Sequence, residues 1–308
     1  MQIGATIIVA WFIVKQLYAQ WHDVERQPLD LQPNWGWIVL GALVVLAAYG
    51  VLIEAWRRIL VAWRASIGFW PAARIMSISR LGLYVPGRIW QVTAMAEMAR
   101  RAKVNPVAAT GSSVLNTIVN IAMGFLVAIV AGGRSLAQIS HGATGTRVAL
   151  LVVALGAILL LPSALPLILG AARRVLKRDL PDVTLPHRAV YVAIVANVVA
   201  WILYGAAFQL FVRGMTGSSP GSIADYVAVW AWSYLAGYLA VVVPGGLGVR
   251  EAALAFALSG LKLASPPTSL VIAVTSRLWL SVVELVPGLL FLIESRRSRS
   301  RAPQPPTT

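Results

Sequence analysis

Long hydrophobic runs, separated by shorter polar and basic segments, dominate the chain. A helix that crosses a bilayer needs about 20 consecutive, mostly apolar residues. Three segments are weaker candidates, because all of them contain charged residues and the last is also short: Gln2–Ala19, Leu270–Ile293 and Val249–Lys262. The uncharged runs of sufficient length are Leu31–Ile53, Val104–Gly133, Val148–Ala172, Ala189–Val212 and Tyr226–Val249. The pattern predicts an all-α integral membrane protein with about eight transmembrane helices.

The composition supports a membrane protein and excludes several kinds of chemistry. Hydrophobic residues make up 58% of the chain and charged residues 12%, against about 25% charged residues in soluble domains. Cysteine is absent, which excludes disulfides, cysteine-based zinc sites and thiol nucleophiles. The phosphate-binding pattern G-x-x-x-x-G-K-[ST] is also absent from the sequence, so we do not expect this chain to use ATP itself. No cofactor and no metal site is predicted.

The basic residues are distributed unevenly. The chain carries 26 Lys and Arg against 11 Asp and Glu, a net charge of +15. The main blocks lie in Arg57–Gly111, in Arg173–Arg188 and in the C-terminal tail. Lys and Arg collect in the cytoplasmic loops of membrane proteins, and eight spans put all three blocks on one side. We therefore predict a multi-pass protein of the cell (cytoplasmic) membrane with both termini in the cytoplasm, and no nucleic-acid partner.

The spacing of these blocks predicts the domain organisation. We expect residues 1–294 to form a single polytopic transmembrane domain and residues 295–308 a disordered basic cytoplasmic tail. Residues 57–103 are too long for a simple loop, and they interleave Trp63 and Trp70 with several arginines. Such interleaving is typical of helices at a membrane interface. It predicts an interfacial or re-entrant segment on the cytoplasmic side, with a small cytoplasmic helical hairpin as the alternative.

Two short motifs combine Val-Pro-Gly with an arginine and precede helix-forming stretches, Val92–Met98 and Ala252–Leu258. Proline removes a backbone donor and glycine permits unusual backbone conformations. Such breaks persist at membrane depth only where protein or water covers the freed backbone. The candidate binding residues are Tyr84, Pro86, Gly87, Arg88 and Gln91 in the first motif, and Gly245, Gly246, Gly248, Arg250 and Glu251 in the second.

The second motif predicts a helix that begins inside the membrane. Residues 248–261 would rise about 21 Å as a helix, less than the ~30 Å hydrocarbon core. A helix start within the bilayer presents unpaired N–H groups that favour an anion, and Arg250 adds a positive charge. A lipid phosphate would fit this position. The alternatives are a tight turn between two helices, and neutralisation of Arg250 by Glu251.

Charged residues also occur in the last predicted span. Arg277 and Glu284 are two helical turns apart, near one face of a helix. A charge at the bilayer centre costs on the order of 2.5–3.5 kcal/mol, so it needs a partner or a wet cavity. One interpretation is a cationic site for a lipid headgroup. The other is a structural ion pair of Arg277 with Glu251 or Glu284. Asn116 and Asn120 share a helix face and are expected to bond to neighbouring helices.

The segments Tyr84–Gln91 and Pro244–Glu251, together with Arg277, resemble the membrane region of lysylphosphatidylglycerol synthase/flippase proteins, and the eight-span layout agrees with that family over nearly the whole chain. The resemblance implies lipid translocation, or an accessory role in the export of lipid-linked glycans. In the two-part synthases, a soluble domain transfers an aminoacyl group and the membrane region translocates the product. This chain ends soon after its last span, so we do not expect the synthase reaction. Leu83 stands where some relatives have a polar or basic residue, which leaves the headgroup open.

Three functions follow as hypotheses. The first is flippase-type translocation of a phospholipid or lipid-linked glycan headgroup through a polar cavity near Arg250, Glu251 and Arg277. The second is a polyprenyl-phosphate-dependent membrane glycosyltransferase, which would use an acid of the outer segment His22–Asp30. The third is a noncatalytic partner of a lipid-modifying synthase. The predicted partners are membrane lipids, anionic or phosphate-bearing, and a lipid-modifying enzyme; the sequence does not predict an oligomeric state.

Overall fold

The described part of this computed structural model is helical, with no strand among the described residues. The structure describes residues 31–63, 65, 67–81, 89–132, 187–240 and 248–300. Its helices are α2 (Trp35–Ala62), α3 (Phe69–Leu81), α4 (Ile89–Arg101), α5 (Pro106–Ala131), α8 (His187–Thr216), α9 (Ile223–Leu239), α10 (Val249–Gly260) and α11 (Pro266–Ser300). The predicted all-α membrane fold is confirmed.

Six of the eight predicted spans fall on described helices: α2, α5, α8, α9, α10 and α11. The other two predicted spans, Gln2–Ala19 and Val148–Ala172, lie outside the described residues. Within the described part, four helices are long and apolar enough to cross a membrane, namely α2, α5, α8 and α11. The helix α2 continues through Arg57, the predicted start of the interfacial segment, to Ala62, and the interfacial position of residues 57–103 stays a prediction. Glu54 pairs with both Arg57 and Arg58 at 2.7 Å along this last part of α2, which keeps the charged turn helical.

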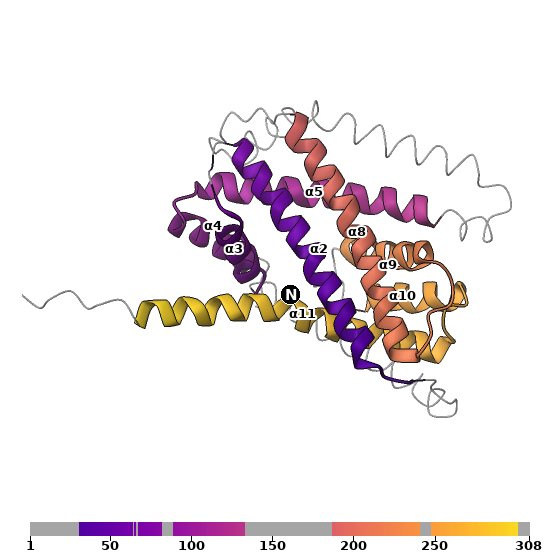
Figure 1. Cartoon of the computed structure of the whole chain (residues 1–308). Coiled ribbons are helices and arrows are strands. Elements are labelled where there is room, and N and C mark those ends of the chain that lie inside the picture. Colours follow the sequence, from indigo (N-terminus) through magenta and orange to yellow (C-terminus); the bar gives the residue numbers. More distant parts are fainter. Residues whose placement is uncertain are drawn as a thin grey trace, which may run out of the picture.

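The two long helices α2 and α8 lie side by side and run antiparallel (Figure 1). Their pairing is fixed at one end by backbone hydrogen bonds, from Gln32 N–H to Met215 O at 2.8 Å and from Asn34 N–H to Gly214 O at 2.7 Å. The Asn34 side chain also accepts from the first N–H groups of α2. Gly214 has no room for a side chain, since a Cβ there would lie 2.6 Å from the Ile38 side chain.

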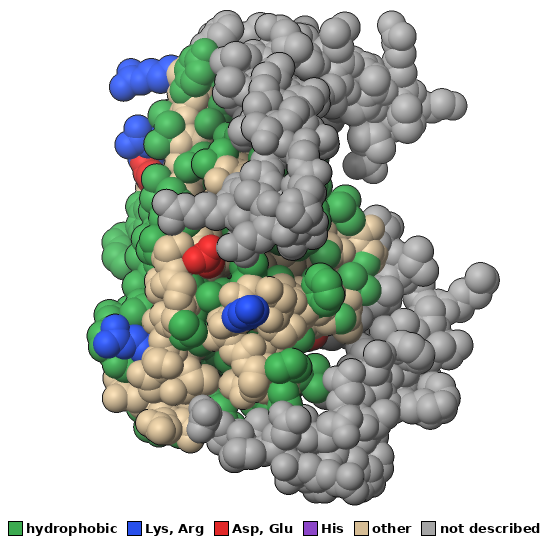
Figure 2. Space-filling model, turned by 90° about the vertical axis from the view of Figure 1, so that its right-hand side faces the viewer, with side chains coloured by type: hydrophobic (Ala, Val, Ile, Leu, Met, Phe, Trp, Pro, Cys, Tyr) green, Lys and Arg blue, Asp and Glu red, His purple; other side chains and the backbone are tan. Residues whose placement is uncertain are grey.

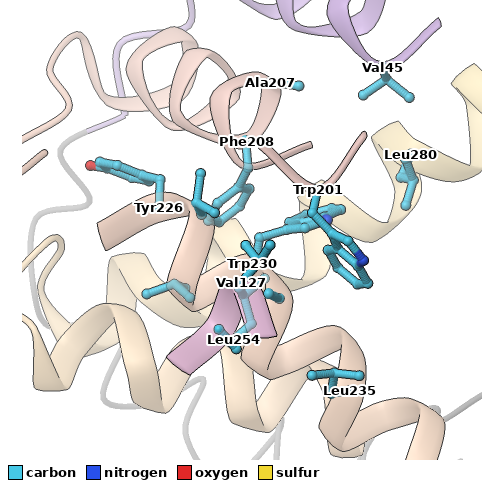
Figure 3. Packing of buried hydrophobic residues seen from close by; sticks show 14 of the residues in the cluster. Val45, Val127, Trp201, Ala207, Phe208, Tyr226, Trp230, Leu235, Leu254 and Leu280 are labelled. Carbon is cyan, nitrogen blue, oxygen red and sulfur yellow. The ribbon is translucent and has the colours of Figure 1, made fainter. Parts of the chain in front are cut away.

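Buried aromatic and aliphatic side chains from six helices meet in the main core (Figure 3). Phe208 of α8 packs against Trp230 of α9, with ring centroids 5.1 Å apart. Val45, Val127, Leu254 and Leu280 come to the same core from α2, α5, α10 and α11. This core holds the shorter helices α9 and α10 against the long ones.

Four helices are too short to cross a bilayer and pack as two hairpins, α9 with α10 and α3 with α4. Their lengths are 17, 12, 13 and 13 residues. Even the longest of them, α9, rises only about 26 Å, against a core of ~30 Å. Residues 82–88 and 241–247, which connect the two helices of each hairpin along the chain, contain the Val-Pro-Gly sequences and lie outside the described residues.

The two hairpins are attached at opposite ends of the bundle. Gly221, just before α9, lies against Leu263, just after α10, and the neighbouring Gly217 lies against Gln32 at the start of the α2–α8 pair. At the other end, Arg74 of α3 pairs with Glu294 near the end of α11 at 2.8 Å. The structure therefore groups the loops predicted on the outer side at one end and the segments predicted on the cytoplasmic side at the other.

The outside of the bundle is strongly apolar, as expected for a protein in lipid. On the face shown in Figure 2, hydrophobic side chains cover broad areas and the charged ones are few and separated. Phe256 is 79% exposed and Leu278 63% exposed, an unfavourable arrangement in water but a favourable one against acyl chains. The chain is a membrane protein by both helix length and surface.

Candidate functional site

The helix α10 begins at Val249, and Gly248 is its N-cap residue. Gly248 has φ +84°, a conformation that side chains other than glycine resist. Its N–H donates to Glu251 Oε2 at 2.6 Å, so the Glu251 carboxylate satisfies one of the N–H groups at the helix start. Gly245 and Gly246 lie outside the described residues. The predicted helix start at this motif is observed, with a carboxylate of the chain at the position predicted for an anion.

Glu251 also joins α10 to α11. Its Oε1 accepts a hydrogen bond from Arg277 Nη1 at 2.9 Å, and the two side chains are 14% and 27% exposed. This is the internal ion pair that the sequence offered as one alternative, with Glu251 as the acid. Glu284 lies two turns after Arg277 on α11, and it contacts Tyr49 of α2 and Arg80 of α3.

Arg250 has aromatic neighbours. Its guanidinium lies 4.7 Å from the ring centroid of Trp230 and 5.3 Å from that of Tyr234, both on α9. Among the described residues no carboxylate lies within ion-pair distance of Arg250, and the nearby Glu251 pairs with Arg277 instead. Gly237 allows the close approach, since a Cβ there would lie 2.8 Å from the Arg250 Cβ. Aromatic faces stabilise a cation without cancelling its charge.

A second charged cluster surrounds Glu284 of α11. Tyr49 of α2 donates a hydrogen bond to Glu284 Oε1, and Arg80 of α3 lies 3.6 Å from the same oxygen. The Arg80 guanidinium also lies 4.3 Å from the centroid of the Tyr49 ring. Tyr49 stands at the midpoint of α2, which runs from Trp35 to Ala62. The cluster therefore lies level with the middle of a spanning helix.

A cavity of about 380 Å³ opens beside this cluster, between α2, α3 and α11. Arg80 and Glu284 line it together with Trp70, Met76 and Pro287. Pro287 has no N–H to donate to the carbonyl one turn earlier in α11, which leaves a further acceptor near Glu284. Charged residues beside a cavity at this depth are typical of a transport or ligand site.

Aromatic residues connect the two clusters. The ring of Tyr49 lies 5.8 Å from that of Tyr204, and Tyr204 lies 6.4 Å from Trp201. Trp201 lies 5.3 Å from Tyr234, whose face carries Arg250. Tyr234 also interacts electrostatically with Glu284 and Arg80. Tyr49, Tyr204 and Tyr234 thus belong to a series of ring contacts that extends from Arg80 to Arg250.

The sequence missed Arg80 and Tyr49 as site residues. Arg80 stood among many arginines of the basic segment, and its helical spacing alone does not distinguish it from Arg74. The signal available in the sequence was its position shortly before Pro86, at the end of a short helix that leads into the first broken motif. Tyr84, Pro86, Gly87 and Arg88 of that motif lie outside the described residues. Gln91 belongs to α4, and its side chain is not described.

The remaining polar pairs have structural roles. Asn197 of α8 accepts from Asn120 at 2.8 Å and donates to Asn116 at 3.2 Å, so the predicted bonding between neighbouring helices is confirmed. Hydrogen bonds from Arg100 and Arg101 hold the pKa of the exposed Glu97 carboxyl at about 2. Among the described residues there is no group of His, Asp and Glu side chains that could hold a metal ion.

Residues 2–288 match the family described as "Lysylphosphatidylglycerol synthase TM region". No curated protein and no solved structure matches the chain significantly. The family match covers both hairpins, both charged clusters and the long helices around them, and it places the chain among membrane proteins of lipid metabolism. This chain belongs to the family of lysylphosphatidylglycerol synthase transmembrane regions.

Proposed function

We propose that the protein translocates a lipid across the cytoplasmic membrane by passing the polar headgroup between the Arg80–Glu284 cluster and Arg250, while the acyl chains stay in the bilayer. The observation that carries this proposal is the convergence of two short hairpins from opposite ends of the bundle. Each hairpin brings an arginine next to its broken motif and against a tyrosine ring, Tyr49 of the spanning helix α2 for Arg80 and Tyr234 of α9 for Arg250. Discontinuous helices at the membrane midplane are the usual construction of transporter binding sites.

The cost of moving a headgroup supports this role for the charged residues. A polar group that enters hydrocarbon without a partner loses several kcal/mol of hydration. Arg80 and Arg250 offer guanidinium groups whose planar donors match phosphate oxygens, and the tyrosine hydroxyls between them are further hydrogen-bond partners. A headgroup phosphate would therefore exchange partners along this route instead of crossing an apolar region.

Arg277 has a supporting part in this proposal. Its pairing with Glu251 fixes α10 against α11, while Glu251 also caps the start of α10. The two contacts hold Arg250 in position against the rings of Trp230 and Tyr234. Arg250 and Arg80 are thus the residues that we expect to contact the headgroup, and Glu251 and Arg277 those that position them.

The experiment is lipid scrambling in proteoliposomes that contain the purified protein and a phospholipid with a fluorescent nitrobenzoxadiazole group. Dithionite bleaches only the outer-leaflet label, so translocation raises the bleached fraction above about half. Label that moves from the inner to the outer leaflet is bleached in a second, slower phase. We expect Arg80→Gln and Arg250→Gln to slow this phase about tenfold or more. Arg101→Gln, an exposed arginine outside both clusters, should match the wild type.

Failure of the wild type to bleach beyond the outer leaflet, with several headgroups tested, would contradict translocation by the chain alone. In that case sugar transfer from a polyprenyl-phosphate sugar would favour the glycosyltransferase, and copurification of a synthase without lipid movement would favour the noncatalytic partner. Equal scrambling rates in the wild type and in both arginine variants would support translocation but would show that these two arginines do not contact the headgroup.

A further inference from the structure

A groove runs along the outside of the α2–α8 pair and has no part in the proposed headgroup route. Its volume is about 880 Å³, within the ~300–1,000 Å³ typical of small-molecule sites. Ala47, Val51, Val192, Val195 and Val199 form apolar walls over most of its length. Only its rim at Gly50 and Phe69 is shared with the cavity beside Glu284.

One end of this groove is charged. Glu54 and Arg58 of α2 and Arg188 of α8 line it there. Because the two helices are antiparallel, the end of α2 and the beginning of α8 lie together at the same end of the bundle (Figure 1). That end is the one predicted to face the cytoplasm. The groove is therefore polar at the level of the headgroups and apolar towards the membrane interior.

The length of the groove corresponds to one leaflet. The groove extends along α2 from Arg58 to Ala47 and along α8 from Arg188 to Val199. Each of these helical stretches rises about 16 Å, which is about half of the ~30 Å hydrocarbon core. The polar and apolar parts of the groove thus have the extent of a single phospholipid standing upright in its leaflet.

The charge at the polar end favours an anionic headgroup. The single carboxylate of Glu54 pairs with both Arg57 and Arg58, so these three side chains together keep a positive charge. Arg58 is 49% exposed, and the structure gives Arg188 no ion pair among the residues that it describes. Arginine and phosphate form charge-assisted, frequently bidentate hydrogen bonds.

We propose that this groove binds an anionic diacyl phospholipid of the adjacent leaflet, with its phosphate against Arg58 and Arg188 and its acyl chains against Val51 and Val195. This site is distinct from the headgroup route and does not depend on translocation. A protein that fails to move lipid would still retain the bound phospholipid.

The test is native mass spectrometry of the detergent-purified protein after exchange with phosphatidylglycerol or with phosphatidylcholine of the same acyl composition. We expect phosphatidylglycerol to be retained about tenfold more than phosphatidylcholine, because the cationic choline of phosphatidylcholine offsets the charge of its phosphate beside the two arginines. We expect Arg58→Gln/Arg188→Gln to remove that preference and Val195→Trp to reduce retention of both lipids by filling the groove.

Matched controls separate the site from general lipid contact. Arg101→Gln removes an arginine that is also paired at i,i+4 with a glutamate, and Val39→Trp adds a ring at another exposed position of α2. Both should retain phosphatidylglycerol like the wild type. The proposal is overturned if Val195→Trp and Val39→Trp retain lipid equally, if inorganic phosphate displaces the bound lipid as an adventitious ion would, or if Val195→Cys forms a disulfide-linked dimer that shows a second copy in the groove.

Discussion

Arg277 of α11 and Glu251 of α10 form a hydrogen-bonded ion pair 2.9 Å long inside the bundle, and the second oxygen of Glu251 accepts from the first turn of α10. One carboxylate thus fixes both a helix start and a helix–helix contact. The pair lies beside Arg250, the arginine with aromatic neighbours, and it determines where that arginine is held.

Removing one partner of this ion pair should lower the stability of the protein. Glu251→Ala removes the carboxylate that pairs with Arg277 in a partly buried position, and breaking a buried ion pair costs up to about 3–5 kcal/mol. We expect a clear fall in the melting temperature of Glu251→Ala in detergent, measured by intrinsic fluorescence. Glu251→Gln/Arg277→Gln should recover part of the loss, because neither side chain is then an unpaired charge. If the double variant lost as much stability as the two single variants together, the two residues would not be coupled.

Arg250 should matter more for function than for stability. Its contacts with Trp230 and Tyr234 contribute about 0.5–2 kcal/mol, and no described ion pair is broken when it is replaced. We expect Arg250→Gln to keep a melting temperature close to that of the wild type while slowing scrambling. Arg250→Lys keeps the charge but loses the planar donors, so its scrambling rate should fall between the two. Full activity of Arg250→Gln would exclude this residue from the route.

Two glycines permit the close contacts of the hairpins. A Cβ on Gly288 would lie 2.8 Å from the backbone oxygen of Ser77, and one on Gly237 would lie 2.8 Å from the Arg250 Cβ. Gly288→Ala should therefore separate α3 from α11 and destabilise the protein by about 1–3 kcal/mol. Gly260→Ala is the matched control, because a Cβ there meets nothing within 4 Å. Equal melting temperatures for the two alanine variants would contradict this packing.

The asparagine contacts between α5 and α8 should have a small effect. Asn197 bonds to Asn116 and Asn120 in a buried position, but hydrogen bonds between transmembrane helices contribute only about 0.6 kcal/mol on average. We expect Asn197→Ala to lower the free energy of unfolding by about 1 kcal/mol, measured in mixed micelles. Asn197→Asp should be worse, since it adds a charge to a site without a described cation. A loss of several kcal/mol for Asn197→Ala would indicate a larger role.

The predicted orientation can be measured without background, because the chain has no cysteine. Ser218 lies in the exposed loop between α8 and α9, and Ala102 lies after α4 at the other end of the bundle. A membrane-impermeant maleimide should label Ser218→Cys in intact cells, and Ala102→Cys only after permeabilisation. The reverse pattern would place the termini outside and would contradict the orientation predicted from the basic blocks.

Much of the architecture could be predicted from the sequence because membrane spans are read from local composition. The long runs that became α2, α5 and α8 needed no knowledge of tertiary contacts. The stretch after Gly248 was counted among the eight spans as a short one, and α10 has only 12 residues. The basic blocks also predicted which loops would share an end of the bundle. These properties depend on burial in lipid, which acts on each segment separately.

The pairing of the charged residues could not be predicted in the same way. The sequence offered two acids as partners for Arg277, Glu251 and Glu284, and it did not favour either of them. The choice depends on how α10 and α3 pack around α11, which involves contacts between distant parts of the chain. Arg80 was overlooked for the same reason, because its neighbours Glu284 and Tyr49 belong to other helices and stand far from it along the chain.

The opposite attachment of the two hairpins has a mechanical consequence. The α9–α10 hairpin is anchored where α2 begins, and the α3–α4 hairpin where α11 ends. Tilting either hairpin about its anchor would uncover the charged interior towards one side of the membrane only, because the other hairpin would still close the opposite side. For the translocation proposed above, such anchors would allow the two sides of the membrane to be reached in turn.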